Sequence, residues 1–145
     1  VRLMKWHYTE PLASELPIRE FEADNAITLP ADYRAFVREN GGGKPERCSY
    51  KTADGREHIV SYLLSFAPGS AVSIHSFNPD TSRYVAIAID PFGSLWCLDR
   101  ETGHIVFRNH ETGSVTDAAE SFSAFLDKLA APGGAQAKET VEKQP

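Results

Sequence analysis

The feature that most constrains the fold is a run of three short apolar segments joined by two tight turns. The segments span residues 84–90, 95–99 and 105–109, and the first alternates Val and Ile with Ala, as a β-strand does. Residues 90–93, Asp-Pro-Phe-Gly, are typical of a β-turn, because proline suits its second position and glycine its fourth. Residues 101–103, Glu-Thr-Gly, form a similarly short connection. Links of this length join antiparallel neighbours, so we predict an antiparallel meander of three strands.

Two helices are predicted before the strands. The first spans 14–24, with Ser14 as its cap, and carries apolar residues three apart on one face. The second spans 30–39 and starts at Pro30, which suits the first helical position. The glycines at 41–43 are expected to end this helix, since glycine adopts the left-handed C-terminal conformation without steric cost.

The remaining segments complete the expected order of elements. Residues 58–66 are rich in Ile, Val, Tyr and Leu and predict a further strand, whereas the polar stretch 44–57 has only a turn signal. A short helical turn is expected around 72–77. The last helix is predicted over 116–129, with Thr116 as its cap and its apolar face packed on the sheet.

These elements define the fold class as α+β, because helices and strands are segregated along the chain. We expect a single domain over residues 1–131 with two N-terminal helices, an antiparallel sheet of about four to six strands, and a C-terminal amphipathic helix packed on the sheet. Residues 132–145 lack apolar periodicity and predict a disordered tail. The length of 145 residues suits one domain whose core needs neither disulfides nor metals.

The charge of the chain limits its partners. The formal net charge is −5 and the isoelectric point about 5.5. An acidic surface repels phosphate, so direct binding to nucleic acid is not expected. Acidity favours a basic protein partner, although it would also serve simply to keep the protein in solution.

Composition also indicates the compartment. No apolar run approaches the ~18 residues of a membrane span, and the N-terminus lacks a signal-peptide pattern. The two cysteines, Cys48 and Cys97, have no zinc-type spacing and are interpreted as reduced thiols. We therefore expect a cytoplasmic protein without membrane attachment.

The residues that could carry catalysis or bind a metal do not form a recognisable pattern. The five histidines show none of the usual metal-ligand spacings. Cys97 lies within an apolar strand and is interpreted as a small buried hydrophobe, whereas Cys48 is expected to be the more exposed thiol. We therefore predict no enzymatic activity, no metal and no cofactor. A small enzyme using Cys97 or a histidine is the alternative.

Several segments taken in order resemble the SUKH superfamily, which includes fungal cell-wall-synthesis regulators and many bacterial immunity proteins. The resemblance runs from about residue 18 to 129. Its first part is the Leu-Pro-Ala-Asp-Tyr run at 29–33 with Phe36 and the Asn-Gly-Gly run at 40–42. Its second part is the strand–turn–strand segment, 84–93 with 96–99. The remaining matching residues are Gly103, Val106, Phe107, His110 and Glu111, followed in the last helix by Phe122, Phe125, Leu126 and Leu129.

What the resemblance implies is a non-catalytic protein-binding domain. Bacterial members of the superfamily typically neutralise a cognate polymorphic toxin by direct binding, and such toxins include nucleases and deaminases that are often basic. The chain is therefore interpreted as an immunity protein, either a monomer or a weak homodimer. The alternative is a regulatory or scaffold module without a toxin partner, as in the fungal members.

The partner-binding surface is predicted around the meander and its turns. The candidate residues are Asp90, Phe92, Trp96, Asp99, Glu101 and Glu111. Phe92 lies at a turn tip, where a large ring is hard to explain as core, whereas Trp96 would also fit simple core packing under the last helix. Asp90 is also expected to cap its turn, and Asp99 either to be solvated beside its turn or to pair with Arg100 or Arg108.

Overall fold

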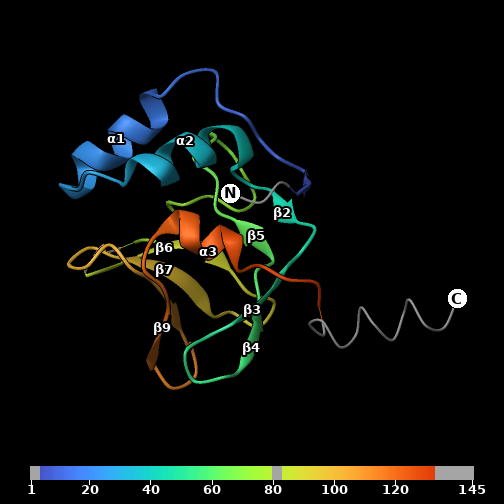
Figure 1. Ribbon diagram of the computed structural model, residues 1–145. Helices are drawn as coiled ribbons and strands as arrows, with labels where there is room; N and C mark the ends of the chain where they lie inside the picture. Colours follow the sequence, from blue (N-terminus) through green and yellow to red (C-terminus); the bar gives the residue numbers. More distant parts are fainter. Residues whose placement is uncertain (1–3, 80–82, 133–145) are drawn as a thin grey trace, which may run out of the picture.

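The computed structural model describes residues 4–79 and 83–132 and is shown in Figure 1. The predicted tail, 132–145, lies outside these ranges apart from its first residue. The short helical turn expected around 72–77 is present only as a series of turns. None of the helices in the described ranges has the length and apolar character needed to cross a membrane. The elements follow in the order β1 (Trp6–His7), α1 (Leu16–Asn25), α2 (Ala31–Asn40), β2 (Lys44–Pro45), β3 (Ser49–Lys51), β4 (Glu57–Ile59), β5 (Tyr62–Leu63), β6 (Tyr84–Ile89), β7 (Leu95–Asp99), β8 (Ile105–Arg108), β9 (Val115–Ala119) and α3 (Phe122–Asp127).

The predicted meander forms the middle of a five-stranded antiparallel sheet with the order β5-β6-β7-β8-β9. Strand β6 pairs with β7 from Tyr84 opposite Asp99 to Ile89 opposite Leu95. Two shorter pairs, β1–β2 and β3–β4, form separate two-stranded sheets. The α+β class and the antiparallel sheet are confirmed, with a strand number inside the predicted range.

Helix α3 lies between the α1–α2 pair and the five-stranded sheet (Figure 1). Phe122 of α3 contacts Tyr33 of α2, with ring centroids 5.2 Å apart. Phe125, one turn further on, contacts Trp96 of β7 at 5.3 Å. The closing helix therefore packs on the sheet as predicted, and it also joins the sheet to the N-terminal helices.

The last helix is shorter than predicted. Residues 116–129 do not form one helix, because the chain first forms β9 and then α3. Thr116 is therefore a strand residue, and the helix is capped by Ser121, whose Oγ accepts the N–H of Ala124 at 3.1 Å. Without β9, strand β8 would be an unpaired edge. Satisfying its backbone groups outweighs helix propensity over so few residues.

The predicted strand 58–66 is divided between two sheets, since β4 pairs with β3 and β5 pairs with β6. The chain changes partner between Val60, whose N–H donates to Cys48 O at 2.7 Å, and Ser61, whose N–H donates to Ile89 O at 2.8 Å. The polar segment before it, in which only a turn was predicted, contributes β2 and β3. Strands this short leave no clear alternation in the sequence.

The glycines at 41–43 end α2 and allow three segments to approach closely. Gly42 has a φ of +79°, and its N–H donates to Leu63 O at 2.8 Å. A Cβ on Gly42 would lie 2.8 Å from the Cδ atom of Glu10. The left-handed residue is thus Gly42 and not Gly41, which has a φ of −57°.

Two buried tyrosines differ in whether their hydroxyl groups have a partner. Tyr33 is 1% exposed, and its hydroxyl has no hydrogen-bond partner among the described residues. The Tyr50 hydroxyl donates to Ala118 O at 2.6 Å.

We expect Tyr33→Phe to leave the free energy of unfolding unchanged or to raise it by up to ~1 kcal/mol, because it removes an unsatisfied buried group.

The matched variant Tyr50→Phe is expected to lower the free energy of unfolding by about 1–2 kcal/mol, because the Ala118 carbonyl loses its donor. Urea unfolding of both variants measures the difference. An equal loss in the two variants would mean that the Tyr33 hydroxyl also has a partner.

Candidate partner-binding site

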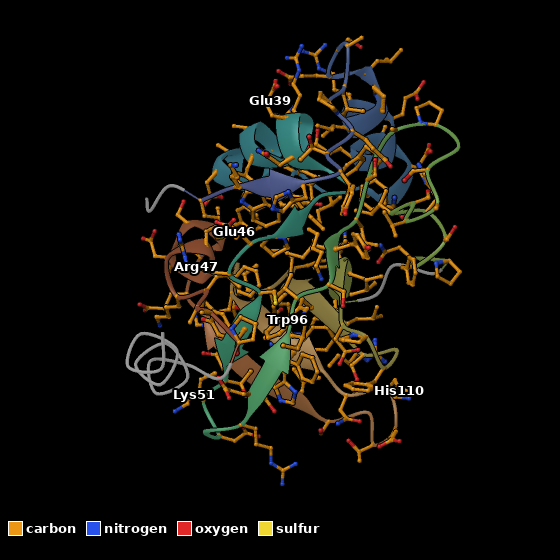
Figure 2. The ribbon with its side chains drawn as sticks, turned by 90° about the vertical axis from the view of Figure 1, so that its right-hand side faces the viewer. Glu39, Glu46, Arg47, Lys51, Trp96 and His110 are labelled. Carbon is orange, nitrogen blue, oxygen red and sulfur yellow. The ribbon has the colours of Figure 1, made fainter. Side chains whose placement is uncertain are left out.

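A cleft of about 400 Å³ lies at one end of the five-stranded sheet, where the β6–β7 and β8–β9 turns meet β4. In Figure 2, His110 marks this end, and Trp96 lies nearer the middle of the molecule. The cleft brings together three of the predicted contact residues, which are Asp90, Phe92 and Glu111. It is also lined by His58, Ser94, Phe107, Asn109 and His110.

The β6–β7 turn holds Phe92 in an exposed position. Asp90 Oδ1 accepts the backbone N–H of Phe92 at 2.9 Å and that of Ser94 at 2.7 Å, which confirms that Asp90 caps its turn. Gly93 has a φ of +98°, a conformation that side-chain-bearing residues rarely adopt. As a result, the Phe92 ring stands in solvent at the turn tip with 76% of its surface exposed.

The second wall of the cleft is the β8–β9 turn, and it is joined directly to the first. Asn109 Oδ1 accepts the backbone N–H of Glu111 at 2.8 Å, which shapes the turn. Ser94 Oγ accepts the backbone N–H of His110 at 3.2 Å, and it also lies 3.2 Å from His110 Nδ1. Ser94 is 4% exposed whereas His110 is exposed, and the contacts between them link the two turns.

Aromatic rings form the inner side of the cleft. The His58 ring stacks on Phe107, with centroids 3.9 Å apart and an angle of 19° between the planes. Phe107 in turn packs against Trp96 at 4.7 Å. Trp96 is fully buried, and its Nε1–H donates to Ile59 O at 3.0 Å. Trp96 is therefore core under α3, in line with the alternative that it packs beneath the last helix, and its side chain is not exposed to a partner in this structure.

Asp99 and Glu101 lie at the far end of β7, a strand length of roughly 15 Å from the cleft. Asp99 is 4% exposed and accepts two hydrogen bonds from Arg83, each at 2.9 Å. Glu101 is exposed and lies 3.6 Å from the same guanidinium. The predicted contact residues therefore do not form one surface, because the sheet places Asp99 and Glu101 at its opposite end.

The expected partner of Asp99 is also corrected. Arg100 donates to the backbone oxygens of Asn25 and Ala26 at the end of α1, at 3.0 and 2.9 Å. Arg108 lies over the Tyr84 ring on the face of the sheet opposite Trp96. The paired donors of Arg83 hold the pKa of the Asp99 carboxyl down at about 2.

Neither cysteine is exposed as a nucleophile would be. Cys97 is 1% exposed, and burial raises the pKa of its thiol to about 12, so it is a poor nucleophile. Cys48 is also buried, contrary to the expectation that it is the exposed thiol, because Val60 pairs with its backbone in the core. No three His, Cys, Asp or Glu side chains in the described ranges gather to hold a metal ion.

Sequence reasoning did not include five of the cleft residues in the site, which are His58, Ser94, Phe107, Asn109 and His110. Ser94 directly follows the predicted turn at 90–93, and Asn109 lies two residues before Glu111, which were usable hints. His58 had no such signal, since it reaches the cleft only through the packing of β4 beside Trp96.

A sequence model of one protein family matches residues 15–126, and the family is described as SUKH_6, SMI1-KNR4 cell-wall. The matched region is the greater part of the chain. It begins one residue before α1, ends in α3 and contains the whole cleft. No curated protein matches the chain significantly.

Replacing Ser94 tests the junction between the two turns. We expect Ser94→Ala to lower the free energy of unfolding by about 1 kcal/mol, because the part-buried hydrogen bond from the His110 N–H to Ser94 Oγ is lost. The exposed Ser76 provides the matched control, and Ser76→Ala should change stability by less than ~0.5 kcal/mol. Urea unfolding measures both, and equal effects would show that the junction contributes nothing.

The pair between Arg83 and Asp99 predicts a pH dependence. A carboxyl whose pKa is lowered on folding stabilises the protein above its unfolded pKa, about 4, and loses that contribution as the pH falls through its folded value of about 2. The stability difference between wild type and Asp99→Asn should be constant from pH 7 to about 5 and shrink towards pH 2. Thermal unfolding across this range measures it, and a constant difference down to pH 2 would contradict the assignment.

Proposed function

We propose that this chain, which belongs to the SMI1-KNR4 cell-wall family of the SUKH superfamily, is an immunity protein that neutralises a cognate polymorphic toxin by direct binding in the cytoplasm. The family is generally non-enzymatic, which agrees with a role based on binding. The proposed contact surface is the end of the sheet where the cleft lies, around Phe92 and Glu111.

The observation that carries this proposal is the exposed ring of Phe92, held on a rigid turn beside a cleft. A large ring with 76% of its surface in water is one of the few exposed large hydrophobic side chains among the described residues. Aromatic side chains that are exposed and pre-ordered are typical anchors of protein interfaces, because little conformational entropy is lost when they are buried. Asp90, Gly93 and the Ser94–His110 junction supply that order.

Charge supports a basic partner. The chain carries a formal net charge of −5, and the two carboxylates that line the cleft belong to Asp90 and Glu111. Opposite charges would accelerate encounter with a basic nuclease or deaminase and would disfavour wrong partners.

The test is to co-express the chain with a toxin encoded beside it, and to measure growth rescue and the dissociation constant. We expect Phe92→Ser and Glu111→Lys each to weaken binding at least tenfold, or ~1.4 kcal/mol, because they remove the anchor and reverse a facing charge. Both positions are exposed, so the fold should be retained.

Matched controls come from the helical end of the molecule. Leu16 on α1 is also an exposed large hydrophobic residue, and Glu39 is an exposed acid at the opposite end of the molecule from His110 in Figure 2. Leu16→Ser and Glu39→Lys should change the dissociation constant by less than ~2-fold. If these variants lose neutralisation and the cleft variants keep it, the proposed surface is wrong.

The match to a family described by a cell-wall role favours a second candidate function, a regulatory or scaffold module without a toxin. The neighbouring gene separates the two ideas. A toxin gene beside this one, whose product the chain inhibits, supports the immunity role. A neighbouring product that is harmless and unbound supports the regulatory role.

A further inference from the structure

We propose that the cleft is a receptor for an arginine side chain of the partner protein, with the guanidinium group against Phe92 and its N–H groups donating to Asp90 and Glu111. This inference rests on the proposed function, since it specifies the chemistry by which the same surface would recognise a basic toxin. It concerns one class of ligand, a guanidinium carried by a polypeptide.

Asp90 has a carboxylate oxygen that is left without a partner. The residue is 8% exposed, and Oδ1 accepts both turn N–H groups. Its Oδ2 atom has no hydrogen-bond partner among the described residues, although Asp90 lines the cleft. Asp90 Oδ2 is not among the fully buried atoms without a partner, so it is open to the cleft and can accept a hydrogen bond from an incoming donor.

Aromatic surfaces beside this carboxylate suit a planar cation. The exposed Phe92 ring follows Asp90 by two residues, and the Phe107 ring with His58 stacked on it lines the other side of the cleft. Guanidinium groups lie flat on such rings while their N–H groups donate within the plane. An ammonium group has no flat face and keeps its hydration more strongly, so arginine is favoured over lysine.

Charge and size agree with this ligand. In the part of the chain that the structure describes, the cleft lining includes the Asp90 and Glu111 carboxylates but no lysine or arginine. A volume of about 400 Å³ accommodates one long side chain and leaves no room for a folded element of the partner.

The test uses the full chain and a blocked Gly-Arg-Gly peptide, followed by NMR titration of the backbone amides. We expect saturable shifts at Phe92, Ser94, His110 and Glu111, with a dissociation constant on the order of 1–10 mM, as is reasonable for one side chain. A peptide with citrulline, which has the same shape without charge, should cause no saturable shift. A lysine peptide should bind at least roughly fivefold more weakly.

Two variants test whether binding of the arginine peptide depends on the charge of Asp90 or only on the fold. Asp90→Asn keeps an oxygen that accepts the turn N–H groups but removes the charge, and it should weaken arginine-peptide binding at least roughly fivefold. Glu39→Gln, at the helical end, should leave binding unchanged. Equal binding of the arginine and citrulline peptides, shifts confined to other parts of the chain, or an unaltered affinity in Asp90→Asn would overturn the proposal.

Failure of the arginine receptor can be distinguished from failure of the proposed immunity role. If Phe92→Ser abolishes toxin neutralisation while the arginine peptide does not bind the wild-type cleft, the immunity role stands and the arginine receptor is overturned. If the peptide binds in the cleft and no toxin is neutralised, the receptor stands and the immunity role fails.

Discussion

The burial of Trp96 is the contact on which the rest of the structure depends. Its indole is fully enclosed and contacts the rings of Tyr50, Phe107 and Phe125, so one side chain joins β3, β8 and α3 to β7. The hydrogen bond from Nε1 to the carbonyl of Ile59 also ties β4 to the sheet. Aromatic residues remove large apolar areas from water, and this arrangement satisfies the one polar atom of the indole at the same time.

The position of the cleft follows from that core. Phe107 packs on Trp96 and carries His58, so the inner side of the cleft is an outward extension of the buried aromatic cluster. The two turns that complete it are held by Asp90 and by the contact of Ser94 with His110. Loops positioned by a rigid scaffold are the usual location of binding residues in proteins.

The elements that could be predicted are those whose signals are local. The meander was predictable because alternation and turn residues occur within a few positions of one another, and the capping role of Asp90 follows from the same turn. The boundary between β9 and α3 was not, because β9 forms only by pairing with β8. The partner of Asp99 was missed for a similar reason. Arg83 stands 16 residues before Asp99 and is brought beside it by the pairing of β6 with β7, whereas Arg100 and Arg108 are closer in sequence but make other contacts.

The sequence by itself determined the family, the α+β class, the antiparallel meander and the exposed turn tip at Phe92, because each depends on residue types at short and regular spacing. Only the tertiary structure decided that Trp96 is core, that Asp99 and Glu101 face away from the cleft, and that His58 joins it. Strand alternation assigns side chains to two opposite faces but does not say which face will be covered. That choice depends on contacts between segments far apart in the chain.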